Sequence, residues 1–201
     1  MARSLLRIST VMALPLVLSA CISLGGGGGK APASLLTLTP VQSAPAGSMA
    51  TATADQAIMV MEPETDAHLA VLRIPVQVDD ANIAYLQGAT WAERPARLFR
   101  ALLAETLRVK TGRLVVEDSQ SSIPITGTRL TGRLIAMGYD ARSGSVVVRY
   151  DAMKTGPKGE LVTKRFESVV PSVAALPAAV GPALNTAAND VALQVAEWMA
   201  F

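Results

Sequence analysis

One position in the sequence combines a reactive side chain with a context that directs chemistry to it. Cys21 is the only cysteine among the 201 residues, and it directly follows Leu18, Ser19 and Ala20. Small residues at 19 and 20 fit a signal peptidase active site, and a thiol immediately after them can be alkylated by a diacylglyceryl group. This pattern, a lipobox, predicts lipid attachment at Cys21. The alternative is a signal peptide whose cysteine stays unmodified.

The segment before Cys21 has the layout of a secretory signal over residues 1–20. Arg3 and Arg7 form a basic start, and residues 8–18 are apolar except for Ser9 and Thr10. This apolar stretch is about half of the ~20 residues that a membrane-spanning helix needs. Several acyl chains such as palmitate anchor a protein stably, at ~0.8 kcal/mol per buried methylene. We therefore expect the mature protein to sit on a membrane without spanning it.

Catalytic chemistry has few candidate residues in the rest of the chain. Acylation of Cys21 would leave no thiol for a disulfide, a metal thiolate or a nucleophile. His68 is the only imidazole, and the acidic residues that precede it favour an ion-paired surface histidine. The sequence also lacks a nucleophile elbow, paired histidines, a Walker motif and a dinucleotide fingerprint. We predict no catalytic residue, no cofactor and no metal site.

Four further residues could serve a site but are better explained structurally. Asp79 and Asp80 could bind Ca²⁺, yet this ion takes about six to eight oxygen ligands and no loop here supplies them, so the pair is expected to end a strand. Trp91 and Trp198 lie on apolar helical faces, which favours core packing over a lipid or partner surface.

Charge excludes nucleic acid as a partner. The chain has 18 basic and 16 acidic residues, but residues 1–20 carry two of the arginines and no acid. The mature chain is therefore neutral, with interspersed charges and no basic cluster.

Composition divides the chain into a signal peptide, a linker and one folded domain. Residues 21–56 contain five successive glycines at 25–29 and a small, polar stretch at 40–56, and both are typical of flexible linkers. Residues 34–39 have a short apolar pattern compatible with an edge strand. Residues 57–201 suffice for one domain with its own core.

Periodicity predicts the elements of that domain. A helix is expected from about residue 93 to 110, with Thr90 and Glu93 at capping-box spacing, Pro95 favouring a start near 93–94, and Gly112 as the stop. A second helix is expected to begin after Pro182 and to end at about Met199. Alternating apolar residues predict a strand at 69–78, and longer strands are expected at 129–139, 145–153 and 161–170. Shorter segments follow at 83–86 and 114–116, and residues 58–61 form a short apolar run. The fold class is α/β, with a mixed, mostly antiparallel sheet and two main helices.

With these elements in order, the chain resembles the ABC-type transport auxiliary lipoprotein family, the PqiC-like proteins. The resemblance is carried by residues 72–85 (LRIPVQVDDANIAY), by Trp91, Ala92 and Glu93, and by residues 98–107. It implies a three-layer-like α/β domain. The stretch between Tyr85 and Trp91 is shorter than in typical members.

The resemblance also implies a function without catalysis. Such lipoproteins work with an ABC transporter and an MCE-type substrate-binding protein that move phospholipid or other lipids between the inner and outer membranes. Ile22 is not the aspartate that retains lipoproteins in the inner membrane, so we expect outer-membrane anchoring with the domain in the periplasm. Two alternatives remain open: a lipid carrier with a cavity lined by Leu102, Val148 and Phe166, and an envelope hydrolase that uses His68.

Overall fold

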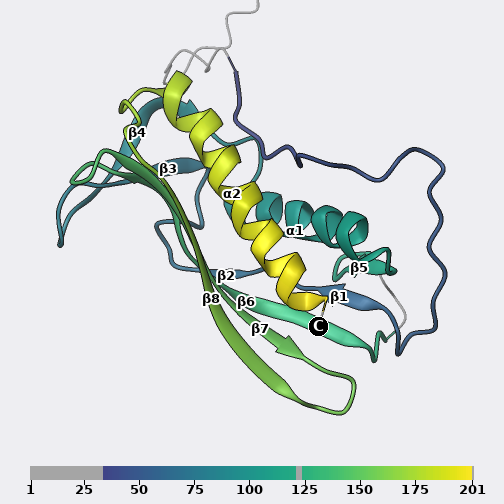
Figure 1. Cartoon of the computed structure of the whole chain (residues 1–201). Helices are drawn as coiled ribbons and strands as arrows, with labels where there is room; N and C mark the ends of the chain where they lie inside the picture. Colours follow the sequence, from purple (N-terminus) through teal and green to yellow (C-terminus); the bar gives the residue numbers. More distant parts are fainter. Residues whose placement is uncertain (1–33, 121–123, 201) are drawn as a thin grey trace, which may run out of the picture. The chain divides into compact units, whose positions relative to one another are not determined.

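The computed structural model describes residues 34–120 and 124–200, which form a mixed sheet and two helices (Figure 1). The elements are, in chain order, β1 (Ile58–Val60), β2 (Glu64–Thr65), β3 (Arg73–Gln77), β4 (Ile83–Thr90), α1 (Pro95–Thr111), β5 (Val115–Glu117), β6 (Thr128–Asp140), β7 (Ser145–Thr155), β8 (Leu161–Val170) and α2 (Pro177–Met199).

The long strand β6 organises the sheet. Along one edge it pairs antiparallel with β7, which pairs antiparallel with β8. Along its other edge, successive segments of β6 pair in parallel with β1, β2 and β3. β5 extends the sheet beside β1, and β4 extends it beside β3. The antiparallel meander predicted for the last three strands is confirmed, and so is the α/β fold class.

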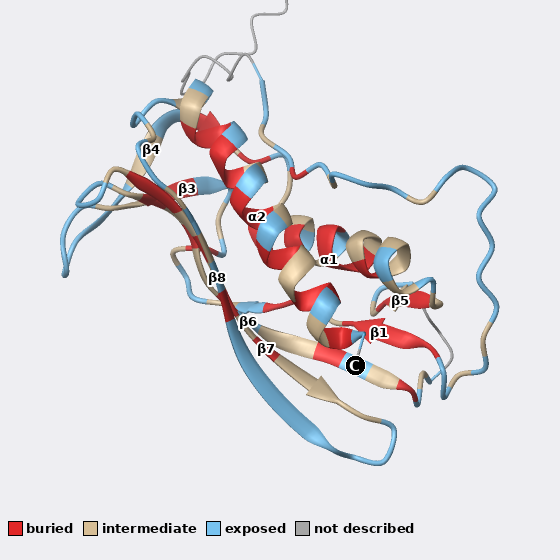
Figure 2. Ribbon diagram, viewed as in Figure 1, coloured by how far each residue is buried: buried red, intermediate tan, exposed pale blue. Residues whose placement is uncertain are grey.

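Both helices pack on one face of this sheet (Figure 2). Val146, Val148 and Tyr150 alternate along β7, and each is fully buried. The ring of Phe99 in α1 meets the Tyr150 ring edge-on, with centroids 5.3 Å apart. The Tyr150 hydroxyl donates to the Thr131 carbonyl at 2.8 Å, and burial raises the pKa of this phenol. The buried side chains that alternate along β7 thus form the sheet side of a single hydrophobic core.

The opposite face of the sheet carries paired charges instead. Arg165 in β8 donates two hydrogen bonds to Asp151 in β7, both at 2.6 Å, and Arg149 pairs with Glu167 across the same two strands. Cross-strand pairs of opposite charge suit a solvated sheet face.

The predicted start of α1 needs one correction. Thr90 does not cap the helix, because it lies at the end of β4 and pairs with Arg73 in the β3 ladder. Arg94 is the N-cap residue and Pro95 occupies the first turn, as the alternative start predicted. Gly112 ends the helix with a φ of 63°, a conformation that glycine adopts without strain.

The predicted start of α2 is wrong. The helix begins at Pro177, and Pro182 lies inside it. Proline inside a helix removes one backbone hydrogen bond, but the preceding turn places Val180 and Gly181 in the core. Burial of that turn offsets the missing bond. None of the helices in the described part of the chain is long and apolar enough to cross a membrane.

Two of the predicted strands have other bounds in the structure. The strand predicted from residue 69 starts at Arg73, because residues 66–70 form a turn in which the Leu69 and Ala70 amides donate to the Asp66 carbonyl. The strand predicted over 83–86 continues to Thr90, since its second half pairs with the start of β3.

Candidate functional site: a strap across two helices

Residues 36–44, here called the strap, lie across both helices although their composition predicted linker. The strap begins at a parallel bridge in which the Leu36 amide donates to the Thr90 carbonyl and the Ala92 amide donates to the Leu36 carbonyl, each at 2.8 Å. This single bridge replaces the edge strand predicted over 34–39. Leu38 is buried in the core. The packed part of the chain therefore includes the strap.

Gly181 allows the strap to approach α2 closely. A Cβ atom at this position would lie 2.8 Å from Leu36 Cδ2, which is shorter than ordinary van der Waals contact. The Leu36 side chain thus occupies space that any larger residue at 181 would need.

Two asparagines of α2 hold the strap backbone. The Thr39 amide donates to Asn185 Oδ1 at 2.8 Å, and the Val41 amide donates to Asn189 Oδ1 at 2.9 Å. Asn189 Nδ2 donates in return to the Thr39 carbonyl at 2.9 Å. Residues four apart share one helical face, so the two amide groups follow the extended strap along α2.

The far end of the strap is held by α1. The Ala44 amide donates to Glu105 Oε1 at 2.7 Å, and Arg108 pairs with the other carboxylate oxygen at 2.9 Å. The hydrogen bond from Ala44 and the charge of Arg108 lower the pKa of Glu105 below its usual range. The strap therefore crosses from α2 to α1, with a charged acceptor at its end.

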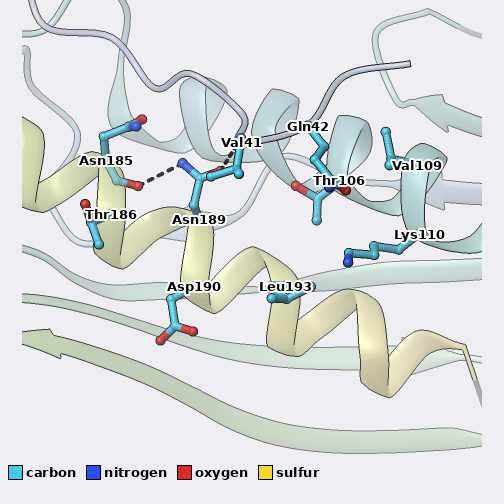
Figure 3. A pocket seen from close by; sticks show the side chains of 10 residues that line it. All are labelled: Val41, Gln42, Thr106, Val109, Lys110, Asn185, Thr186, Asn189, Asp190 and Leu193. Carbon is cyan, nitrogen blue, oxygen red and sulfur yellow. Dashed lines mark hydrogen bonds between the residues drawn. The ribbon is translucent and has the colours of Figure 1, made fainter. Parts of the chain in front are cut away.

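The strap and the two helices border an open groove of about 410 Å³ (Figure 3). Val41 and Gln42 form one wall. The other lining residues come from α1 (Thr106, Val109 and Lys110) and from α2 (Asn185, Thr186, Asn189, Asp190 and Leu193). We call this the interhelical groove. Its lining mixes apolar side chains with amides and two opposite charges.

A family model described as the ABC-type transport auxiliary lipoprotein component matches residues 36–196. The chain belongs to this family. The match begins at the first residue of the strap, so it includes the strap as well as the sheet and both helices. The lipoprotein family that the sequence resembled is thereby confirmed.

Solved structures share the fold of this auxiliary lipoprotein. One is a Xanthomonas campestris protein of the family DUF330, which is 16% identical, with a TM-score of 0.67 over 83% of this chain and 94% of that one. Another is an uncharacterized protein, 13% identical, with a TM-score of 0.63 over 83% of this chain and 99% of that one. No curated protein matches significantly.

The predicted lipidation site of the auxiliary lipoprotein, Cys21, lies outside the described residues. His68 is partly buried in the turn before β3, and no ion pair to it forms within residues 34–120 and 124–200, so its predicted ion pairing is not observed there. No group of three or more metal-ligating side chains gathers in the part of the chain that the structure describes.

The remaining candidate residues have structural roles. Asp79 follows the end of β3 as predicted, and its carboxylate accepts from the Ala81 and Asn82 amides, both at 2.9 Å. These hydrogen bonds, with that from the Asn82 side chain as the largest cause, lower the pKa of Asp79. Asp80 pairs with Arg142.

Both tryptophans pack against core residues as predicted, but Trp91 lies in the bridge to Leu36 before α1 and not on a helical face. Trp91 is fully buried in the core, and its indole N–H has no partner among the described residues. Trp198 packs on Phe166, with ring centroids 5.5 Å apart.

Sequence reasoning missed the residues that hold the strap. It singled out neither Asn185 and Asn189 in α2 nor Glu105 in α1 for a contact. Two asparagines on one face of an alanine-rich helix are the available signal, because asparagine is a poor helix former whose amide suits a backbone partner.

Proposed function

We propose that this auxiliary lipoprotein is a non-enzymatic docking component of an ABC transporter and MCE-type complex that moves phospholipid between the membranes. In this proposal, acylated Cys21 anchors the chain in the outer membrane and the folded domain lies in the periplasm. The family match over residues 36–196 carries the proposal. The lipobox supports the anchor, and Ile22 after the cysteine supports outer-membrane sorting.

The arrangement of the core favours docking over lipid carriage. Leu102, Val148 and Phe166, the residues expected to line an acyl-chain cavity, belong to one packed core cluster and are at most 2% exposed. A filled core leaves no space there for a lipid tail. The hydrolase alternative is disfavoured because His68 has no carboxylate partner within the described residues.

Complementation of a strain that lacks the gene tests this proposal. The wild-type chain should incorporate labelled palmitate, fractionate with the outer membrane and restore phospholipid transport. Cys21→Ser should fold but lose the label and transport, whereas His68→Ala should restore transport fully.

Chemical crosslinking in the same strain tests the partner. We expect the wild-type chain to crosslink to an MCE-domain protein. Absence of palmitate from the wild-type chain would contradict the anchor, and loss of transport in His68→Ala would contradict a purely docking role.

A further inference from the structure

The strand β8 forms one edge of the sheet, and its outer side has no partner strand in the described part of the chain (Figure 1). Backbone amides and carbonyls along such an edge can pair with a further strand. Three large apolar side chains of β8 are exposed, namely Leu161 (65%), Val162 (45%) and Val169 (48%). The Gln194 side chain donates to the Glu167 carbonyl at 3.2 Å, and a carbonyl oxygen can accept a second hydrogen bond. The edge is therefore long, partly apolar and able to pair.

Two copies of β8 can pair side by side only in certain registers. Identical antiparallel strands are related by a two-fold axis perpendicular to the sheet, so both copies keep their helices on the same face. Residues that lie opposite each other then point to the same face. Because side chains alternate between the faces along a strand, two residues can be opposite only if an even number of positions separates them. Each register therefore places one residue opposite its own copy.

The charges of β8 select one of these registers. A centre at Lys164, Arg165 or Glu167 places like charges directly opposite each other, which is destabilising. A centre at Phe166 instead places Arg165 of each copy opposite Glu167 of the other. Centres nearer the ends of the strand shorten the overlap, whereas the centre at Phe166 keeps residues 162–170 paired.

The same register would extend ion pairs that already exist within one copy. On the sheet face opposite the helices, Arg165 pairs with Asp151 and Glu167 pairs with Arg149. Pairing of two copies would join these into a row of alternating sign that runs from Asp151 and Arg165 to Glu167 and Arg149 of the second copy. The two-fold axis repeats the row in the opposite direction. The outer edge of β8 is therefore complementary in charge to a second copy of itself.

We propose that two copies of this chain pair through the outer edges of β8, antiparallel and in the register centred on Phe166. On the face that carries the helices, Val162 lies opposite Val170 of the second copy. The two sheets continue into one, and both copies present α1, α2 and the strap on the same side, so a pair offers two docking surfaces that face one way. The pairing does not depend on acylation of Cys21.

Cysteine crosslinking of the full-length chain in cells tests this pairing. Thr163 and Val169 lie opposite each other in the proposed register, and both are exposed. Copies with Thr163→Cys and copies with Val169→Cys are co-expressed with different tags and treated with a short bismaleimide. A dimer that contains both tags should form. Either variant expressed alone should give no dimer, because its two cysteines would lie about 20 Å apart along the strands, and the wild-type chain should give none.

Matched controls separate the pairing from chance encounters. Leu161→Cys co-expressed with Thr163→Cys should give no mixed dimer, since these positions would lie about 26 Å apart along the strands. Arg165→Glu, added to both copies of the crosslinking pair, places carboxylates opposite each other and should lower the mixed dimer at least about fivefold. Lys158→Glu makes the same change of charge in the turn before β8 and should leave the yield unchanged. Circular dichroism checks that both charge variants fold.

Each outcome bears on the pairing separately from the anchor. Absence of a mixed dimer between the Thr163→Cys and Val169→Cys copies would overturn the pairing, whether or not Cys21 carries palmitate. An equal yield with Leu161→Cys in place of Val169→Cys would overturn the register. A crosslink from position 163 to a different protein, without the mixed dimer, would assign the edge of β8 to a strand of that protein and overturn pairing with a second copy.

Discussion

Asn189→Ala should loosen the strap without unfolding the sheet. The substitution removes the hydrogen bond from the Val41 amide and the bond to the Thr39 carbonyl, both 2.9 Å long. Each such bond contributes about 0.5–1.5 kcal/mol net, while alanine regains up to about 0.7 kcal/mol of helix propensity. The free energy needed to detach the strap from the helices should therefore fall by about 1–2 kcal/mol.

Native-state hydrogen exchange measures this loss at the amide concerned. Protection of the Val41 amide should fall by a factor of about 5–30, which corresponds to 1–2 kcal/mol. Protection of Val148, in the strand between β6 and β8, should change little if the opening is local. Thr186→Ala serves as the matched control and should leave Val41 protection as in the wild type. Unchanged protection of Val41 in Asn189→Ala would refute the assignment of these bonds to strap stability.

Three further predictions concern charge and backbone packing. Folding lowers the pKa of Glu105, so the stability that its carboxylate contributes is complete above the ordinary pKa of 4.5 and is lost as the pH falls below that value. Hydrogen exchange of the strap amides should therefore accelerate on acidification in the wild type, but less in Glu105→Gln. The Arg100 side chain is 12% exposed and pairs with three carboxylates, so Arg100→Ala should lower the free energy of unfolding in urea by about 3 kcal/mol. Arg97 is 53% exposed, and Arg97→Ala should lower it by less than about 1 kcal/mol. Equal losses in the two variants would contradict the effect assigned to burial. A Cβ at Gly132 would lie 2.2 Å from the Asp151 carbonyl oxygen, so Gly132→Ala should lower the thermal midpoint through a cost of at least about 1–3 kcal/mol, and an unchanged midpoint would show that the two strands separate easily.

Local patterns accounted for most elements but not for where they begin. The helix stop at Gly112 and the meander of β6, β7 and β8 follow from local turn chemistry and alternation. Thr90 shows the limit: its spacing to Glu93 suits a capping box, yet pairing with Arg73 keeps it in a strand. Pro182 shows the same limit, because burial of the preceding turn outweighs its local preference for a helix start.

The sequence by itself determined the chemistry available to this protein. The position of Cys21 behind a basic and apolar segment, the single histidine and the missing catalytic motifs are all local or compositional properties. They predict an anchored, non-enzymatic lipoprotein without reference to any contact, and the family match shows an auxiliary lipoprotein component of ABC-type transport.

Only the tertiary structure decided that the strap packs on both helices. The amides of Thr39 and Val41 find their acceptors 146 and 148 residues away in the sequence, and the Ala44 amide finds Glu105 61 residues away. Small, polar residues of a strap resemble a linker because their backbone, rather than their side chains, makes most of the contacts. Such backbone contacts leave no periodic pattern in the sequence. The strap can therefore be recognised only from the positions of both helices in the structure.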